Sequence, residues 1–269
     1  MITNWLITGD THGSLERFEA SNLTVRNPEN TGIIVLGDFG ANYYLNKRDA
    51  RFKERVSQLP YTFYLVRGNH EARPQDIKGM ETLYDENVCS QIYWQPNYPN
   101  IRYFMDGGFY SLGDKKALVI GGAYSVDKYY RLANKWQWFS NEQLNENERK
   151  NIYDSLLDYL KNDSVDLILT HTAPIEFEPT ELFLNCLNQE SVDKSMEKWL
   201  QTIYDIIPDS CCWLLGHYHG DMVMAENVFM LYNKIIDLNL IEPLDHPNIE
   251  MPKDFRLSRL YTLTHYIYT

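Results

Sequence analysis

The N-terminal stretch Trp5-Leu6-Ile7-Thr8-Gly9-Asp10-Thr11-His12-Gly13 joins a short apolar run to a carboxylate and an imidazole. The same order returns in Ile33-Ile34-Val35-Leu36-Gly37-Asp38. Continuous apolar runs of this length suit strands that are covered on both faces. In open α/β sheets, ligands bind at the carboxyl ends of the strands, so each stretch predicts a strand that ends at a shared site.

Three later parts of the chain have the same form. The run 63–66 is followed by Asn69 and His70, the run 166–170 by His171, and the run 212–215 by His217 and His219. Five strand ends are therefore predicted to meet at one rim of the fold.

The segments between these strands predict helices and a few weaker strands. Charged, periodic residues predict a helix over 47–59, and a capping box at Ser140-Asn141-Glu142-Gln143 predicts a second helix that runs to about Lys161. Three short apolar runs within 101–123 are broken by glycines, which predicts a meander on the far side of the fold and a mixed sheet.

The sequence as a whole predicts one domain over residues 1–269. An insertion at about 173–210 is expected to be partly helical, from Glu190 to about Tyr204, and a peripheral tail begins at about 245. The alternation in 257–269 would suit an edge strand. Neither a repeat nor a linker-like boundary interrupts the sequence.

Charge and composition narrow the function. A net charge of −12 over 269 residues argues against a dedicated binder of duplex nucleic acid, since such proteins cluster Lys and Arg against phosphates. Bound divalent metals would offset part of the charge, so a small phosphorylated substrate remains a suitable partner. Neither a signal peptide nor a stretch of membrane-spanning length is visible. The sequence makes no prediction of the oligomeric state.

The cysteines favour a reduced environment. Four are present, without the paired spacing of a zinc ribbon or the density of a disulfide scaffold. The adjacent Cys211 and Cys212 are expected to be buried free thiols on a strand. We therefore expect a cytoplasmic protein.

The residues at the strand ends are of the types that bind divalent metals. Oxygen and imidazole ligands suit manganese, iron or zinc, and two ions that share one carboxylate can clamp both oxygens of an in-line displacement at phosphorus. Asp10 and His12 can face one ion, and Asp38 can bridge two. Asn69 offers an amide oxygen, and the shells would be completed by His171, His217 and His219.

Taken singly, each residue has a plainer interpretation. An Asp at a strand end often caps a helix, and Asn often occupies a turn. A lone His is more often a hydrogen-bonding residue than a ligand. Because several such coincidences would have to occur together, the metal site is the better explanation. His246 and His265 are expected to be surface or packing residues.

Five motifs in this order resemble the calcineurin-like metallophosphoesterases, from Gly9 to about Gly220. They are GDTHG at 9–13, GDFG at 37–40, RGNHE at 67–71, THTAP at 170–174 and GHYH at 216–219. The resemblance implies an α/β fold, a sandwich of two mixed sheets flanked by helices. It also implies a dinuclear phosphoesterase in which a metal-bridging hydroxide attacks phosphorus.

The resemblance also implies a role for each motif residue. One metal ion would be held by Asp10, His12 and His219, and the other by Asn69, His171 and His217. Asp38 would bridge the two ions, for which manganese is favoured over iron or zinc. His70 would not be a ligand but the proton donor to the leaving oxygen.

One position departs from the serine/threonine protein phosphatases of this superfamily. Those enzymes carry an Asp three residues after the bridging Asp, followed by an Arg, whereas Asp38 is followed by Phe39, Gly40, Ala41 and Asn42. The Asp that would orient His70 and the Arg that would bind phosphate are both missing there. This weakens a protein phosphatase function.

The segment 121–131 offers a substitute, and it is similar to one in uncharacterised bacterial and phage members of the superfamily. We predict that Arg131 contacts the scissile phosphate, that Asp127 orients His70 or a metal-bound water, and that Tyr124 helps to bind the substrate. The alternative is a solvated loop with tyrosines packed beneath it. The following aromatic run 136–139 could stack on a nucleobase, but a packed helix start is favoured.

Three enzyme classes and one non-enzyme remain open. A nucleotide or cyclic-nucleotide phosphodiesterase fits the acidic charge and the 20 Tyr and 6 Trp residues, a protein phosphatase fits RGNHE, and a nuclease lacks a basic track. The alternative that is not an enzyme is a catalytically silent metal-binding interaction module, which would keep the fold for recognition and have no activity. A small nucleotide-type phosphomonoester or phosphodiester is the favoured substrate.

Overall fold

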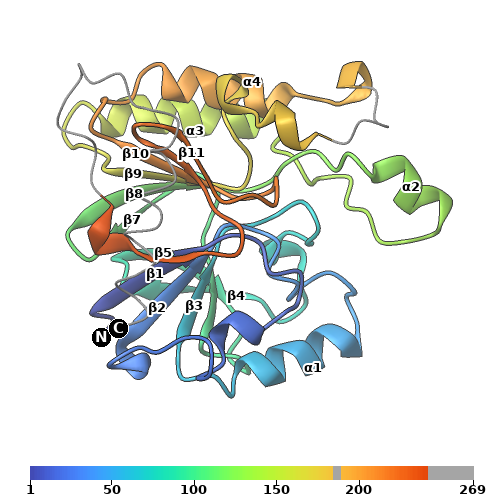
Figure 1. The fold of residues 1–269 in the computed structure, drawn as a ribbon, viewed down its shortest axis with the longest axis vertical. Helices are drawn as coiled ribbons and strands as arrows, with labels where there is room; N and C mark the ends of the chain where they lie inside the picture. Colours follow the sequence, from blue (N-terminus) through green and yellow to red (C-terminus); the bar gives the residue numbers. More distant parts are fainter. Residues whose placement is uncertain (184–188, 242–269) are drawn as a thin grey trace.

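Two β-sheets stacked face to face form the centre of the molecule in the computed structural model (Figure 1), which describes residues 1–183 and 189–241. The expected edge strand at 257–269, His246 and His265 lie outside the described residues. The prediction of an α/β sandwich of two mixed sheets is confirmed.

The first sheet has seven strands in the order β13-β1-β2-β3-β6-β5-β4. Strands β1, β2, β3 and β6 pair in parallel, and the outer strands pair antiparallel. Their bounds are β1 Asn4–Thr8, β2 Thr31–Val35, β3 Thr62–Leu65, β4 Glu81–Asp85, β5 Ser90–Trp94, β6 Ile101–Tyr103 and β13 Ile235–Asp237.

The second sheet has six strands in the order β11-β12-β10-β9-β8-β7. Its four central strands, β12, β10, β9 and β8, pair in parallel. The bounds are β7 Gly108–Leu112, β8 Lys115–Ile120, β9 Leu167–Thr170, β10 Cys212–Leu215, β11 Met222–Ala225 and β12 Val228–Met230.

Alternate residues of the central strands belong to different cores. In and just after β2, Ile34 and Leu36 join the core between the sheets, whereas Ile33 and Val35 join the core on the outer face of the first sheet. Side chains of successive strand residues point to opposite faces, so a strand covered on both sides has to be apolar throughout. This is why the runs are continuous rather than alternating.

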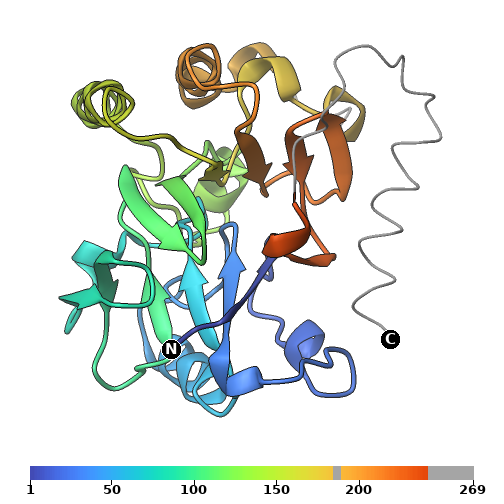
Figure 2. The ribbon, with the colours of Figure 1, turned by 90° about the vertical axis from the view of Figure 1, so that its left-hand side faces the viewer.

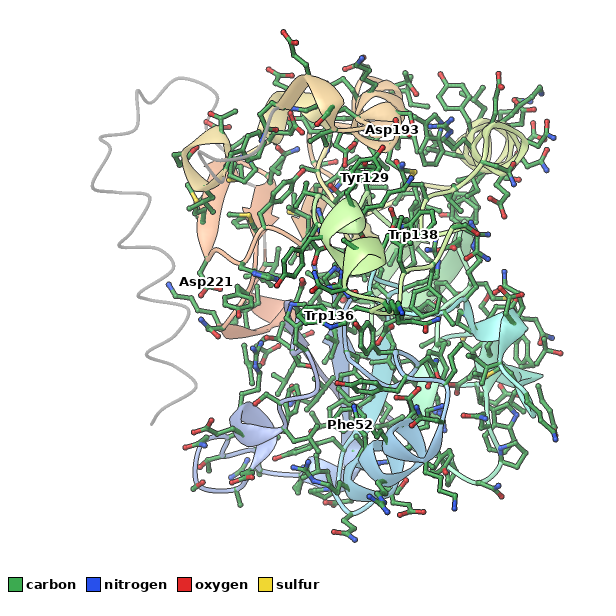
Figure 3. All side chains as sticks on the ribbon, turned by 90° about the vertical axis from the view of Figure 1, so that its right-hand side faces the viewer. Phe52, Tyr129, Trp136, Trp138, Asp193 and Asp221 are labelled. Atoms are coloured by element: carbon green, nitrogen blue, oxygen red, sulfur yellow. The ribbon has the colours of Figure 1, made fainter. Side chains whose placement is uncertain are left out.

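Helices cover both outer faces and complete a four-layer arrangement (Figures 1 and 2). Helix α1, Lys47–Val56, lies against the first sheet, and α3, Glu146–Tyr159, and α4, Ser195–Tyr204, lie over the second. The short helix α2, Lys128–Ala133, stands apart from these layers, and Figure 3 views the molecule from its side. None of the helices within the described ranges is long and apolar enough to span a membrane.

The expected meander at 101–123 is wrong. Strand β6 joins the first sheet beside β3, and the chain then crosses to the second sheet, where β7 and β8 form a hairpin. Gly107 lies at this crossover with φ 79°, and a Cβ there would come 2.5 Å from Ile152 Cγ1. Short apolar runs do not show which of two sheets they join. The only sequence signal of the crossover between the sheets is therefore Gly107.

The predicted capping box at 140–143 is also wrong. Helix α3 begins after Asn145, whose side chain accepts from the backbone N–H of Glu148 while the Glu148 carboxylate accepts from that of Asn145. Glu142 is instead buried beside Ser125. Two capping patterns follow each other here, at 140–143 and 145–148, and only the later one caps the helix.

The insertion and the cysteines agree more closely with expectation. The helix predicted from Glu190 begins five residues later, at Ser195, and ends at Tyr204. Cys211 and Cys212 are buried free thiols, and burial raises the pKa of Cys212 to about 11. The assignment of the chain to one domain stays a prediction.

Candidate active site

The polar residues after five buried strands come together at one edge of the two sheets. Strands β1, β2 and β3 of the first sheet and β9 and β10 of the second deliver them. Among the described residues, three close groups of possible metal ligands form there, with ligand atoms within 4.8 Å of one another: Asp10, His12 and His219; His12, Asp38 and His70; Asp10, Asp38 and His171.

The backbone is held in unusual conformations at these positions. His12, Asp38, His217 and His219 have positive φ angles of 47°, 39°, 69° and 55°. A non-glycine residue in this region costs on the order of 1–3 kcal/mol and persists only where surrounding structure imposes it. Strain of this kind concentrates at functional sites.

Glycines inside the motifs make room for the site side chains. A Cβ on Gly68 would lie 1.8 Å from Asp38 Oδ1, and a Cβ on Gly37 would lie 1.9 Å from His171 Nδ1. No side chain fits at either place, so GD and RGN are steric requirements of the site as well as turn signals.

Asp10, His12 and His219 form a group that fits one metal ion. The two Nε2 atoms of His12 and His219 are 2.8 Å apart, and they lie 3.8 and 3.5 Å from Asp10 Oδ2. That carboxylate oxygen is buried and has no hydrogen-bond partner within the described part of the chain. Ligand atoms held at about 2.1 Å from one ion lie roughly 3 Å apart, so this donor set suits a cation.

A second group surrounds Asp38 and the buried His171. His171 Nε2 lies 2.7 Å from Asn69 Oδ1 and 3.7 Å from Asp38 Oδ2. The other ring nitrogen, Nδ1, lies 2.7 Å from the carbonyl oxygen of Leu36 and donates to it. This hydrogen bond fixes the tautomer and leaves the Nε2 lone pair directed at the site, as metal-bound histidines require.

Two residues that the sequence did not single out hold Asn69. The Asn69 amide donates from Nδ2 to Ser125 Oγ at 2.8 Å, and Ser125 Oγ donates to Glu142 Oε2 at 2.5 Å. This chain of hydrogen bonds turns Asn69 Oδ1 toward His171. The only sequence signal for Ser125 was its place in the 121–131 segment, and Glu142 was misassigned to a helix cap.

Of the predicted carboxylate and imidazole ligands, His217 is the one that joins none of the three close groups found among the described residues. Its backbone N–H donates to Asp10 Oδ1 at 3.0 Å, and its ring lies beside that of His171 with centroids 4.9 Å apart. Burial and the neighbouring His171 lower the pKa of His217 to about 3. The ring is therefore neutral at physiological pH, which is the form that binds metals.

His70 lies between two carboxylates. Its Nδ1 is 3.6 Å from Asp38 Oδ2, and its Nε2 is 3.7 Å from Asp127 Oδ1. Burial alone would lower the pKa of His70, but Asp38 and Asp127 outweigh it and raise that pKa. A raised pKa favours the protonated ring, which is the form that a general acid needs.

Helix α2 and the residue before it supply the groups that are absent after Asp38. Asp127 precedes the helix, and Arg131 lies within it, with Nε 2.7 Å from Asp127 Oδ2 and Nη2 3.1 Å from both ring nitrogens of His70. Arg131 Nη1 donates to the Tyr43 hydroxyl at 2.9 Å. Arg131 is only 8% exposed, so the solvated-loop alternative is wrong for this residue.

Replacing Arg131 by alanine is expected to lower kcat/KM by about a hundredfold, as loss of one charged donor to a reacting group does. The measurement is steady-state kinetics with bis(p-nitrophenyl) phosphate and Mn²⁺. Lys128→Ala is the matched control, since Lys128 belongs to the same short helix but packs over Trp138. An unchanged kcat/KM in Arg131→Ala would refute the predicted phosphate contact.

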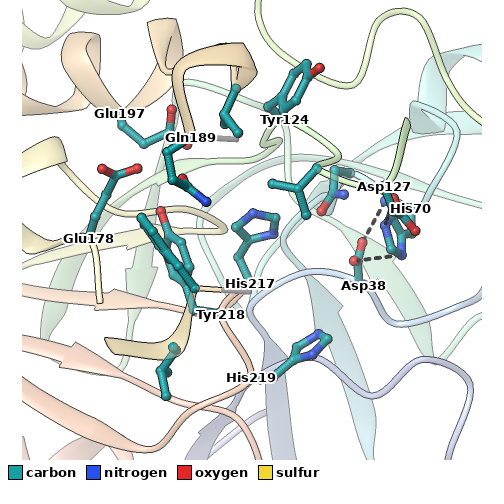
Figure 4. A pocket seen from close by; sticks show the side chains of 15 residues that line it. Asp38, His70, Tyr124, Asp127, Glu178, Gln189, Glu197, His217, Tyr218 and His219 are labelled. Carbon is teal, nitrogen blue, oxygen red and sulfur yellow. Dashed lines mark hydrogen bonds and ion pairs between the residues drawn. The ribbon is translucent and has the colours of Figure 1, made fainter. Parts of the chain in front are cut away.

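Two cavities have Asp38 and His70 in common among their lining residues. The larger, about 480 Å³, is also lined by Tyr124, Phe183, Glu197 and Tyr218, among others (Figure 4). The smaller, about 360 Å³, includes His12, Tyr43, Tyr44, Arg48 and Arg131. Tyr124, which is predicted to help bind the substrate, is one of the lining residues, and that role stays a prediction.

The aromatic run 136–139 does not start a helix, so that expectation is wrong. Residues 136–139 are irregular, Trp136 is exposed and Phe139 is buried. Figure 3 shows Trp136 and Trp138 close to α2. Trp136 packs edge-on against Tyr130, with ring centroids 5.4 Å apart, and Lys128 Nζ lies 4.3 Å from the Trp138 ring centroid. The run 136–139 therefore packs against residues of α2.

Comparison with known proteins gives one family match. Residues 4–221 match the family model described as calcineurin-like phosphoesterase. No curated protein matches the chain. One solved crystal structure aligns with 89% of this chain and 96% of its own at 14% identity and a TM-score of 0.47, a similarity too low to carry an argument.

Proposed function

This chain belongs to the calcineurin-like phosphoesterase family, and we propose that it hydrolyses a small phosphodiester with the help of two divalent metal ions. Membership and the groups of possible ligands support a metal-dependent phosphoesterase in general. The observation that carries the finer proposal is the position of Asp38, which lies close to a proposed ligand of each ion: it groups with His12, and its Oδ2 is 3.7 Å from His171 Nε2.

The proposed ligands divide as the family motifs imply. Asp10, His12 and His219 would hold one ion, Asn69, His171 and His217 the other, and Asp38 would bridge them. When bound, two such ions polarise phosphate oxygens and lower the pKa of water from about 15.7 to about 7. Manganese is the favoured metal, with iron and zinc as the other candidates.

The side chains around the ligands would orient the substrate and move its proton. Arg131 would bind a phosphate oxygen, since its guanidinium points at His70 and is already anchored by Asp127 and Tyr43. His70 would deliver a proton to the leaving oxygen. Asp127 would orient His70 from the side opposite Asp38, which replaces the Asp that Ala41 cannot supply.

The cavities favour a small diester over a protein or a long nucleic acid. Two pockets that meet at Asp38 and His70 could hold the two arms of a diester. The larger, at about 480 Å³, lies within the usual range of roughly 300–1,000 Å³ for small-molecule sites, and its wall carries Glu178 and Glu197. A protein phosphatase stays an alternative function. Protein phosphatases carry an Asp where this chain has Ala41, followed by an Arg, but Asp127 and Arg131 could take the roles of these two missing residues.

The proposal is tested by turnover of bis(p-nitrophenyl) phosphate and p-nitrophenyl phosphate by the Mn²⁺-loaded protein. We expect hydrolysis of both, with the diester preferred. Zero turnover of both substrates with metal bound would instead support a silent metal-binding module. A preference for the monoester would overturn the diester assignment but keep the reaction class.

A further inference from the structure

Helix α4 carries a buried acid that faces the larger cavity. Glu197 is 4% exposed, yet it lines that cavity together with Tyr124 and Tyr218. Figure 4 places Glu197 and Tyr218 across the cavity from His70 and Asp127. Glu197 belongs to none of the groups of possible metal ligands and is not used by the proposed mechanism.

One oxygen of Glu197 is satisfied and the other is not. Oε1 accepts a hydrogen bond from Thr172 Oγ1 at 2.8 Å. Oε2 is buried and has no hydrogen-bond partner among residues 1–183 and 189–241. Leaving a buried polar atom unpaired costs roughly 1–3 kcal/mol, and more for a charged group. An unpaired carboxylate oxygen on a cavity wall is therefore a position at which a ligand can contribute a donor.

The neighbouring hydroxyl groups cannot supply that donor. The single hydroxyl proton of Thr172 is given to Glu197, so the contact of 3.0 Å between Thr172 and the Tyr218 hydroxyl has Tyr218 as its donor. The ammonium group of Lys194 is paired with Glu178 at 2.7 Å. Burial raises the pKa of Glu197 to about 7, against smaller opposing effects of hydrogen bonds, and a hydrogen bond donated by a ligand would favour the ionised form of this carboxyl group.

The rest of the wall suits a flat, uncharged group. Apolar side chains of Val126, Leu182 and Val192 line the cavity together with the rings of Tyr124, Phe183 and Tyr218. The lining residues that the structure describes include Glu178 and Glu197 but no Lys or Arg, so the wall offers no cation to a second anionic group. A planar ring system with an N–H edge satisfies both features, and nucleobases with an exocyclic amine have this chemistry.

We propose that this cavity binds a nucleobase of the substrate and that Glu197 Oε2 accepts a hydrogen bond from an amino group of that base. The inference names the substrate class of the proposed phosphodiesterase and rests on that function. Glu197 would then be a residue that determines specificity, without a part in the bond-breaking step.

The test measures binding of free nucleosides to the Mn²⁺-loaded protein by calorimetry. Nucleosides carry no phosphate, so no turnover intervenes. Adenosine, guanosine and cytidine carry amino groups, and purine riboside differs from adenosine only by lacking one. At least one amino-bearing nucleoside is expected to bind about tenfold more tightly than purine riboside, the effect of one charge-assisted hydrogen bond.

Glu197→Gln should abolish this preference, because its amide would present a donor where Oε2 accepts. Lys198→Gln, on the exposed side of the same helix, should retain it. Equal binding of all four nucleosides by the unmodified protein would overturn the proposal, whatever the stability of the variant. A preference that survives Glu197→Gln would also overturn it.

The two hypotheses fail separately. Hydrolysis of bis(p-nitrophenyl) phosphate without any nucleoside preference would keep the phosphoesterase and reject the base-binding cavity. A nucleoside preference that depends on Glu197, in a protein that hydrolyses neither p-nitrophenyl ester, would keep the cavity and reject the proposed function.

Discussion

Substituting asparagine for Asp38 is expected to lower kcat/KM for bis(p-nitrophenyl) phosphate on the order of a thousandfold or more, the size of effect seen when a central electrostatic group is removed. Asp38 is 2% exposed, and its Oδ2 lies within 3.7 Å of both His70 Nδ1 and His171 Nε2. Asparagine keeps the shape but removes the charge that two cations would share. Steady-state kinetics and metal analysis of the same sample measure the effect.

Asp85→Asn provides the matched control for the loss of a buried carboxylate. Asp85 is as deeply buried as Asp38, but it pairs with Arg102 and accepts from Tyr64 at the edge of the first sheet. This variant should melt at a lower temperature while the folded protein keeps its metal and its kcat/KM. If Asp38→Asn retained full activity and full metal content, Asp38 would not be the bridging ligand.

His70→Ala is expected to reduce kcat by about a hundred- to ten-thousandfold with a poor leaving group, the range for loss of a general acid. The reduction should be much smaller with p-nitrophenyl esters, because p-nitrophenolate leaves without needing a proton. A set of aryl phosphodiesters with different leaving groups measures this difference. An equal loss across that set would contradict the assignment of His70 as proton donor.

The metal content of His70→Ala resolves a second question. His70 lies in a close group with His12 and Asp38, although the family resemblance makes it a proton donor and not a ligand. The variant should bind as much metal as the unmodified protein. Loss of one ion would reassign His70 to the ligand set.

The sequence was a good guide wherever local physical chemistry decides the outcome. Strands buried on both faces must be apolar throughout, and their ends bring Asp10, Asp38, Asn69 and His171 together. The glycines before Asp38 and Asn69 are required because a Cβ on Gly37 or Gly68 would collide with a site side chain. Each of these features can be predicted from the residues at its own positions in the sequence.

Features that depend on tertiary packing were harder to predict. The layer change between β6 and β7 involves two similar apolar runs that join different sheets. Glu142 looks like part of a helix cap but supports Asn69 through Ser125. Glu197 lies in a helix whose pattern does not reveal that one carboxylate oxygen faces a cavity.

The groups that contact His70 were predictable from the sequence only in part. The composition of 121–131 suggested a substitute for the missing Asp and Arg, and the structure brings Asp127 and Arg131 to His70. Sequence could not show that Arg131 is held by Asp127 and Tyr43, because Tyr43 is 88 residues away along the chain. The roles of Asp127 and Arg131 stay predictions, and the kinetics of Arg131→Ala address them.

The most direct test of the central claim is to count the metal ions that restore activity. Metal is first removed from the protein with EDTA, and circular dichroism checks that the metal-free protein is folded. Mn²⁺ is then added stepwise, and the number of Mn²⁺ ions bound and the rate of bis(p-nitrophenyl) phosphate hydrolysis are measured at each step. We predict no hydrolysis in the chelator and full recovery only when two Mn²⁺ ions are bound per chain. Full activity in the chelator, or full recovery with a single ion, would contradict the dinuclear site.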